Sequence, residues 1–348
     1  MRGGFARQAA QVSASVEASG IPHTLHPPSP RNSTCFQQSG QKLWTSSTMI
    51  PHPAHRGGSA KSSAQRAQVL NAATTISRLS PEARHRTSAA MPAELFDMEL
   101  RALRRDRAFR RGGELFLLER VFEDCLDRLG LLQQGFGSAL LIGCPDPAWP
   151  HRLRDFAREV VVLDPGRCFA QAAGGSCVVE DDMEVAAERH DLCVAVGTLD
   201  TVNDLPKALT RIRASLAPSA FFLGAIAGGD TLPQLRSAMR AADQVQGFAV
   251  PHVHPRIESA MFASLLSGAG FANPVVDVDR VQVSYEDLGR LVHDLRAMGA
   301  TNILKQRSSR SMSRAARQAA LDAFAAAGQS GRTVETFEIL NFAAWTPA

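Results

Sequence analysis

The sequence predicts an α/β fold, in which a doubly wound parallel sheet is covered by helices on both faces. Between Ser138 and Gly228, apolar runs of five to nine residues alternate with helical segments. Runs that are apolar throughout, without alternation, are typical of strands buried on both faces. Two late segments, 273–285 and 332–347, read as longer strands. We expect these two to pair antiparallel at the edge of the sheet.

Two amphipathic helices are predicted before the sheet, within residues 92–134. In the second, apolar residues recur at the spacing of one helix face, from Leu115 to Leu129. The first carries a row of arginines opposite its apolar side: Arg101, Arg104, Arg105, Arg107, Arg110 and Arg111. We interpret this row as a solvated face, and the alternative is a clamp for an acidic group of a substrate.

The remaining elements follow in order along the chain. Strands are predicted at 139–143, 160–164, 176–180, 191–199 and 220–228, with helices between them at 147–159, 166–174, 183–189 and 203–218. Pro206 falls in the first turn of the last of these helices, where proline is tolerated. Four further helices are predicted at 232–243, 257–271, 286–300 and 313–328.

Charge divides the chain into unlike parts. Residues 1–90 hold ten basic and two acidic residues, a net of +8, which leaves 28 basic and 32 acidic residues in 91–348, a net of −4. The folded part has no basic face of the kind that nucleic acids require, so we expect no nucleic-acid partner. No apolar run reaches 18 residues, so no transmembrane segment is predicted.

The first ninety residues are rich in Ser, Thr, Gln, Pro and His and show no helical or strand period. Three interpretations stay open: a disordered tail, an organelle transit peptide, or an artefact if translation starts at Met91. The predicted domains are therefore 1–90, a helical segment 91–134 and a main domain 135–348. The protein is expected in a bacterial cytoplasm, or in mitochondria if the transit peptide is genuine.

Six cysteines occur without a C-x-x-C pair: Cys35, Cys125, Cys144, Cys168, Cys177 and Cys193. Several lie inside predicted strands or helices, so buried free thiols are expected rather than a disulfide framework or a zinc site. His252 and His254 in "VPHVHPR" could form half of a metal site, but no third ligand is nearby in the sequence. We interpret them as surface residues and predict no metal.

Candidate ligand-binding residues follow the predicted strands, where doubly wound sheets bind their ligands. Asp164 ends the second strand, and its carboxylate could accept both hydroxyls of a ribose, or it could cap the next helix. After the third strand, Glu180 to Met183 could bind an adenine, or form a solvated acidic turn. After the fourth, Asp200 and Asn203 could orient a substrate, although Asn203 or Asp204 could equally cap a helix.

The loop after the first strand is unusual. Gly143 is followed by Cys144, Pro145, Asp146 and Pro147, and the two prolines lack the N–H groups that glycine-rich loops donate to a ligand. Asp146 would repel a pyrophosphate and could contact an ammonium group. The loop therefore favours a cofactor with a positively charged amino-acid end over a dinucleotide, and S-adenosylmethionine carries such an end.

Residues 94–345 resemble the class I S-adenosylmethionine-dependent methyltransferases. The stretches that carry the resemblance include "LFDMELRALRRDRA", "TLDTVNDLPKALTRIRASLAP", "GGDTLPQLRSAM", "LVHDLRAMGATNIL" and "VETFEIL". More narrowly, the chain is similar to the branch containing the malonyl-carrier-protein methyltransferase of biotin synthesis and a mitochondrial complex I assembly factor that acts on an arginine. The resemblance implies a Rossmann-like sheet of seven strands with the last strand antiparallel.

The same resemblance implies contacts with S-adenosylmethionine from Gly143, Asp164, Asp181 and Leu199. Where relatives have an aromatic residue before "VND", this chain has Asp200-Thr201. Three hypotheses follow: a methyltransferase-like protein with an unknown acceptor, a complex I assembly-factor-like protein that modifies an arginine of a protein subunit, or a non-catalytic pseudoenzyme. Asp200 and Asn203 are the weak catalytic candidates.

Overall fold

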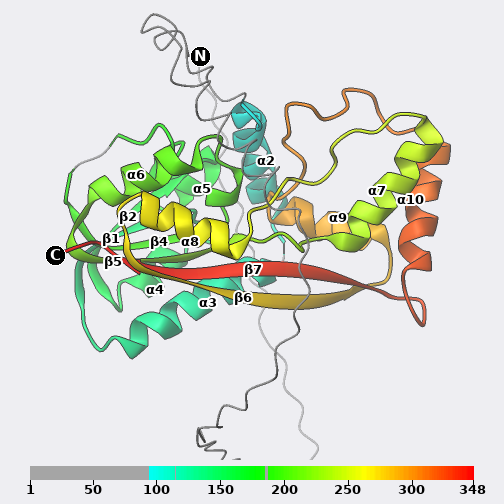
Figure 1. Ribbon diagram of the computed structural model, residues 1–348. Helices are drawn as coiled ribbons and strands as arrows, with labels where there is room; N and C mark the ends of the chain where they lie inside the picture. The colour runs from blue at the N-terminus through cyan, green and yellow to red at the C-terminus, as the bar shows by residue number, and fades with distance from the viewer. Residues whose placement is uncertain (1–93, 114, 185–186) are drawn as a thin grey trace, which may run out of the picture. The chain divides into compact units, whose positions relative to one another are not determined.

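The computed structural model describes residues 94–113, 115–184 and 187–348, and Figure 1 shows their arrangement. The segment 1–90, including Cys35, lies outside the described residues, and so does part of the helix predicted at 183–189. The elements are α2 (Met98–Arg111), α3 (Phe116–Leu131), β1 (Phe136–Ile142), α4 (Trp149–Leu153), β2 (Ala157–Asp164), α5 (Arg167–Ala172), β3 (Ser176–Cys177), β4 (His190–Val196), η2 (Leu199–Thr201), α6 (Leu205–Ser215), β5 (Leu216–Ala227), α7 (Pro233–Gln246), α8 (Ser259–Gly268), β6 (Ala272–Tyr285), α9 (Leu288–Ala297), α10 (Arg314–Ala326) and β7 (Thr333–Trp345).

The strands form one seven-stranded sheet in the order β3-β2-β1-β4-β5-β7-β6. All neighbouring pairs from β3 to β5 are parallel, and β7 is antiparallel to both of its neighbours. The prediction of a doubly wound, seven-stranded sheet with the last strand antiparallel is confirmed. So is the antiparallel pairing of the two late strands.

Two apolar cores lie on the two faces of the sheet. Side chains of β1, β4 and β5 alternate between a core shared with α3 and α4 and a core shared with α6 and α8. Because successive side chains on a strand point to opposite faces, strands covered on both sides must be apolar throughout. This is why the continuous apolar runs of the sequence identified them.

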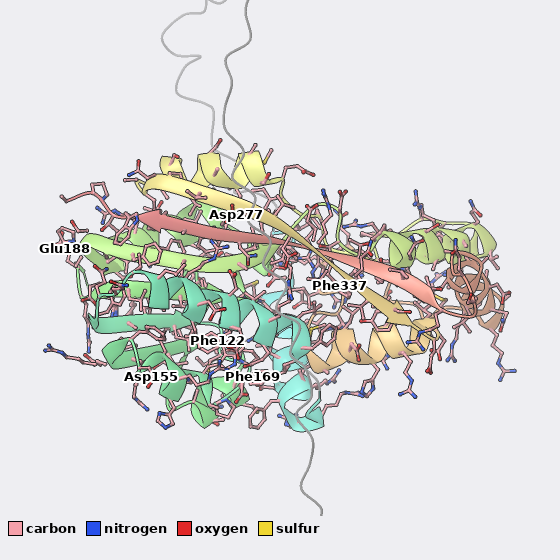
Figure 2. The ribbon with its side chains drawn as sticks, turned by 90° about the horizontal axis from the view of Figure 1, so that it is seen from below. Phe122, Asp155, Phe169, Glu188, Asp277 and Phe337 are labelled. Carbon is pink, nitrogen blue, oxygen red and sulfur yellow. The ribbon has the colours of Figure 1, made fainter. Side chains whose placement is uncertain are left out.

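The outer strands β6 and β7, with 14 and 13 residues, extend beyond the ends of the parallel strands. The residues of β7 from Ile339 to Trp345 pair with β5, whereas those from Thr333 to Glu338 pair with β6 alone. This extension packs against α7, α9 and α10, which belong to the same core as α3. Figure 2 labels Phe337 on this extension of β7 and Phe122 on α3.

Some predicted boundaries were wrong. The helix predicted at 147–159 ends at Leu153, and β2 already begins at Ala157. The third strand, predicted at 176–180, has two residues only. The helix is cut short because pairing of β2 with β1 begins at Ala157, and β3 is short because only Ser176 and Cys177 of this edge strand pair with β2.

The cysteine prediction is confirmed in part. Cys125, Cys144 and Cys193 are free and buried, Cys168 is half-buried, and Cys177 is exposed, so the two cysteines nearest to β3 depart from the expectation. Burial raises the pKa of Cys125 to about 12. Desolvation likewise raises the pKa values of Cys144 and Cys193, so both remain protonated at neutral pH.

Candidate ligand site at the carboxyl end of the sheet

Two buried ion pairs close the end of the sheet where the sequence predicted a cofactor. The guanidinium of Arg105 on α2 binds Asp164 through both of its oxygens, at 2.9 Å (Nε–Oδ1) and 2.5 Å (Nη2–Oδ2). Arg101, one helical turn earlier, binds Glu180 in the same two-pronged way, at 2.7 and 2.9 Å. All four side chains are at most 6% exposed.

The prediction that the arginine row is a solvated face was therefore wrong for Arg101 and Arg105, which are buried. Their spacing of four residues places both on the face of α2 that meets the sheet. The alternative, a clamp for an acidic group, describes Arg101 and Arg105 better, but the acids that these arginines bind belong to this chain and not to a substrate. Arg107, Arg110 and Arg111 of the same helix are exposed.

Asp164 has no acceptor capacity left for a ribose. Besides the two bonds from Arg105, its carboxylate accepts the backbone N–H groups of Cys144 at 2.8 Å and Gly166 at 2.6 Å. A carboxylate offers about four lone-pair positions, and all four are taken. Gly166 is itself the N-cap of α5, so the side chain of Asp164 holds the turn before the helix rather than capping it.

Glu180 stays ionised through its partner. Burial alone would raise the pKa of this carboxyl group, but the charge and hydrogen bonds of Arg101 hold it below its usual value. Arg101 also donates to the carbonyl of Thr198 at 2.7 Å, which ties α2 to the end of β4. The interpretation of Glu180 to Met183 as a solvated acidic turn was wrong for all but Asp182, because Glu180, Asp181 and Met183 are buried.

The loop after β1 is closed as well. The N–H of Gly143 donates to Leu163 O, and that of Cys144 donates to Asp164. Gly143 has φ +83°, and a Cβ at this position would lie 2.2 Å from Val196 O. Asp146 accepts the N–H of Ala148 with its own carboxylate. The polar groups of Gly143, Cys144 and Asp164 that a cofactor would contact are thus hydrogen-bonded within the protein.

Most of the other predicted site residues hold neighbouring segments of the fold together. Asn203 makes two hydrogen bonds to the backbone of Phe96, accepting from its N–H and donating to its carbonyl, so it anchors the chain before α2. Asp204 caps α6 by accepting the N–H of Lys207. Leu199 is buried in the core beside α6, and Asp181 accepts the N–H of Asp204. Leu199 and Asp200 line one cavity at this end of the sheet, and Asp200 alone of these predicted residues lines a second.

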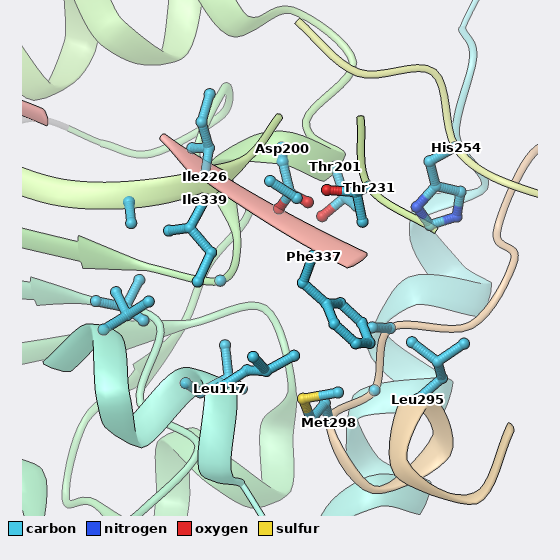
Figure 3. Close-up of a pocket in the computed structure, with 18 of the residues that line it drawn as sticks. Leu117, Asp200, Thr201, Ile226, Thr231, His254, Leu295, Met298, Phe337 and Ile339 are labelled. Atoms are coloured by element: carbon cyan, nitrogen blue, oxygen red, sulfur yellow. The ribbon is translucent and has the colours of Figure 1, made fainter. Parts of the chain in front are cut away.

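That cavity lies beyond the two arginines, between α3, the carboxyl ends of β4 and β5, α9 and β7. It encloses about 130 Å³. Arg101 and Arg105 line it, whereas Asp164 and Glu180 are behind them. Figure 3 shows the polar residues Asp200, Thr201, Thr231 and His254 along one side, with Leu295 and Met298 on the other.

Three residues of this cavity escaped the sequence analysis or were misread by it. Arg256 pairs with Asp200, and its side chain is 6% exposed. His254 was interpreted as a surface residue, but it is buried, and its Nε2 accepts the N–H of Ile303 at 3.0 Å. Glu338 arrives from β7. His254 and Arg256 lie in a loop with two prolines, and the sequence "VPHVHPR" was the signal by which a functional loop could have been recognised.

His252 and His254 have different hydrogen-bond partners and do not form the metal site that their spacing could have provided. His252 pairs with Asp243 at 2.8 Å, while His254 contacts Ile303 and the ring of Phe96. Within the part of the chain that the structure describes, no group of three or more His, Cys, Asp and Glu could hold a metal ion. No helix among residues 94–113, 115–184 and 187–348 is long and apolar enough to cross a membrane.

The buried imidazole of His254 makes the stability of the protein depend on pH. Burial, followed by the charge of Arg256, lowers its pKa to about 4 from a usual value of 6.5. As the pH falls from 6.5 to 4, the unfolded chain takes up a proton that the folded chain refuses, so stability is lost across that window, by about 3 kcal/mol at most. We expect urea unfolding at pH 7 and pH 5 to show a smaller loss for His254→Gln than for the wild type. Equal losses in both proteins would contradict a neutral buried histidine.

The fold is that of a class I methyltransferase-like protein. Its defining feature is the seven-stranded order with one antiparallel strand, and a cavity lies at the carboxyl ends of the parallel strands. The chain is 30% identical over 251 residues to "Arginine-hydroxylase NDUFAF5, mitochondrial" of Danio rerio, covering 67% of this chain and 75% of that protein. The chain belongs to the NDUFAF5 family of methyltransferase-like proteins.

Other relatives agree with this placement. The mouse protein of the same name is 31% identical over 224 residues, covering 60% of this chain and 64% of the mouse protein. The chain thus spans three quarters of the Danio rerio protein and just under two thirds of the mouse protein. "Malonyl-[acyl-carrier protein] O-methyltransferase" of Xylella fastidiosa is 35% identical over 168 residues, covering 47% of this chain and 55% of that enzyme. No family model matches the chain.

Solved structures of similar shape are remote. The N-methyltransferase NodS of Bradyrhizobium japonicum, in complex with S-adenosyl-L-homocysteine, has a TM-score of 0.40 and 17% identity, covering 72% of this chain and all of NodS. The YcgJ protein of Bacillus subtilis has a TM-score of 0.44 and 9% identity, covering 64% of this chain and 99% of YcgJ. At these values the likeness adds nothing to the topology described above.

Proposed function

We propose that this protein binds S-adenosylmethionine at the carboxyl ends of β1, β2 and β4, in a state in which α2 has withdrawn Arg101 and Arg105. The observation that carries the proposal is that the acids held by these two arginines are Asp164, the last residue of β2, and Glu180, which follows β3. Doubly wound folds place their ligand contacts there. Methyl transfer to an acceptor is the activity that the methyltransferase relatives support.

A second candidate is a ligand-binding protein without transfer activity. It is favoured by the saturation of Asp164, whose four acceptor positions are all occupied within the protein, and by the two prolines of the loop after β1. In this case the ion pairs of α2 are permanent parts of the core.

Calorimetric titration of S-adenosylmethionine and S-adenosylhomocysteine into the full chain separates the two candidates. If α2 opens, Arg101→Gln frees Glu180, and the cofactor binds at least ten times more tightly than to the wild type. Asp164→Asn loses binding, and Arg107→Gln, an exposed arginine of the same helix, changes nothing. Thermal melting followed by circular dichroism confirms that each variant is folded.

No heat of binding at millimolar cofactor, in the wild type and in Arg101→Gln alike, would exclude a cofactor site and leave the second candidate. A wild-type dissociation constant near micromolar corresponds to about 8 kcal/mol. Weaker binding in Arg101→Gln than in the wild type would show that the arginine contacts the cofactor instead of competing with it.

The names of the relatives point to two different acceptors, an arginine and a malonyl group on a carrier protein. A protein acceptor is part of this proposal, but a free guanidinium suits the cavity poorly. Arg101, Arg105 and Arg256 already line it, and the carboxylates of Asp200 and Glu338 are engaged by Arg256 and Arg280.

The cellular location depends on the first ninety residues. We propose the mitochondrion if 1–90 is a transit peptide, and the bacterial cytoplasm if translation starts at Met91.

A further inference from the structure

The cavity beyond the arginine pairs has two chemically different sides. Its apolar side is formed by α3, α9 and β7, through Leu117, Leu118, Val121, Leu295, Met298 and Phe337. Its polar side is formed by the ends of β4 and β5 and by the loop before α8 (Figure 3). A ligand that fills the cavity therefore needs one apolar part and one polar part.

The polar side is rich in hydrogen-bond donors. Arg256 donates Nη1 to Asp200, but its Nε is buried and has no partner among the described residues. An arginine carries five N–H donors and no acceptor, so an unpartnered buried Nε requires an acceptor atom from elsewhere. Leaving such a group unpaired is costly, and a ligand oxygen would satisfy it.

Arg236 lies behind this side, where it donates to the carbonyls of Thr231 and His254. Its pKa is lowered, first by burial and then by the charge of Arg256, so these two arginines repel each other. His254 is held neutral at its rim. The acids that line the cavity, Asp200 and Glu338, are each neutralised by an arginine. A negatively charged ligand group would relieve this repulsion.

We propose that this cavity binds an amphipathic anion, with a carboxylate against Arg256 and a hydrocarbon part against Leu117, Leu295 and Met298. Calling that molecule the acceptor rests on the proposed function, but its binding does not. A cationic ligand group would be repelled by Arg236 and Arg256 and could not accept the N–H of Arg256 Nε, and an uncharged ligand would leave the repulsion between the two arginines in place.

Three ten-carbon probes of equal length test the proposal: decanoate, decanol and decylamine. Each displaces the uncharged fluorescent dye N-phenyl-1-naphthylamine from the full chain, below the concentrations at which the probes aggregate and without cofactor. We expect decanoate to displace the dye at a concentration at least tenfold lower than decanol does, equivalent to about 1.4 kcal/mol. Decylamine should be the weakest.

Variants of the ion pair give effects of opposite sign. Arg256→Gln should abolish the preference for decanoate over decanol, and Arg256→Lys should keep part of it. Asp200→Asn should strengthen decanoate binding, because it releases Arg256 from its internal partner. Arg189→Gln removes an exposed arginine that pairs with Glu159 and does not line the cavity, so it should leave all three probes unchanged.

Equal displacement by decanoate and decanol in the wild type would overturn the proposal, and so would an unchanged preference in Arg256→Gln. Failure of the dye to bind at all would show a closed cavity and would overturn it too. Because the assay contains no S-adenosylmethionine, its outcome is independent of whether the cofactor titration succeeds.

Discussion

Replacing Arg105 with methionine is expected to lower the free energy of unfolding by about 3 to 5 kcal/mol. The variant leaves the carboxylate of Asp164, which is 0% exposed, without its counter-ion in the interior of the protein. A buried ion pair contributes little net stability when both partners are present, but losing one partner leaves an uncompensated charge. Urea unfolding followed by circular dichroism measures the loss.

Two further variants make this expectation specific. Arg107→Met removes an exposed arginine from the same helix and should change stability by less than about 0.5 kcal/mol. The double variant Arg105→Met/Asp164→Asn removes both charges and should recover part of the loss. A single variant that loses less than about 1 kcal/mol would mean that Asp164 reaches water or another cation once Arg105 is gone.

The second large effect is expected from Phe122→Ala. Phe122 on α3 stacks on Trp149 of α4 with ring centroids 4.2 Å apart and planes 5° from parallel, and both side chains are 0% exposed. Removing a buried phenylalanine ring costs about 3 to 5 kcal/mol, because transfer free energy is lost and a cavity remains. Phe122→Leu should cost less than about 1.5 kcal/mol because it keeps most of the volume.

Phe248→Ala is the matched control for this pair of variants, since Phe248 is 40% exposed. It should shift the urea midpoint little. A loss for Phe122→Ala no larger than that for Phe248→Ala would show that α3 and α4 close over the missing ring, which would contradict the expected cavity. Trp149 fluorescence should respond to Phe122→Ala alone.

The sequence predicted the sheet well because of how its strands are buried. Residues such as Leu140 and Leu141 point to opposite faces, and both faces carry a core, so the local composition was decisive. Where local composition was ambiguous, the prediction was wrong. The segment from Arg154 to Glu159 contains helix-forming residues, yet β2 already starts at Ala157, because pairing with β1 begins there.

The site was predicted less completely. The sequence placed Asp164 and Glu180 at strand ends, which was right for Asp164 only, because β3 ends at Cys177, and it left both acids available to a ligand. Their partners, Arg105 and Arg101, lie 59 and 79 residues earlier in the chain. No local pattern tells which acid an arginine on a helix will meet, since that depends on where α2 is docked. The same limit applies to Arg256, whose partner Asp200 comes from a different loop.

The hydrogen bonds at Phe96 and Asp97 determine the point about which α2 could rotate. The backbone of Phe96 is bound by Asn203, and Asp97 donates its N–H to Ile303, so the helix is fixed at its first residues. For any rotation about this fulcrum, displacement grows with distance from it. Arg105 lies four residues, about 6 Å, farther along the axis than Arg101. An outward swing would therefore move Arg105 farther than Arg101, and it would also have to break the hydrogen bond from the N–H of Cys168 to Asp106 in the second half of the helix.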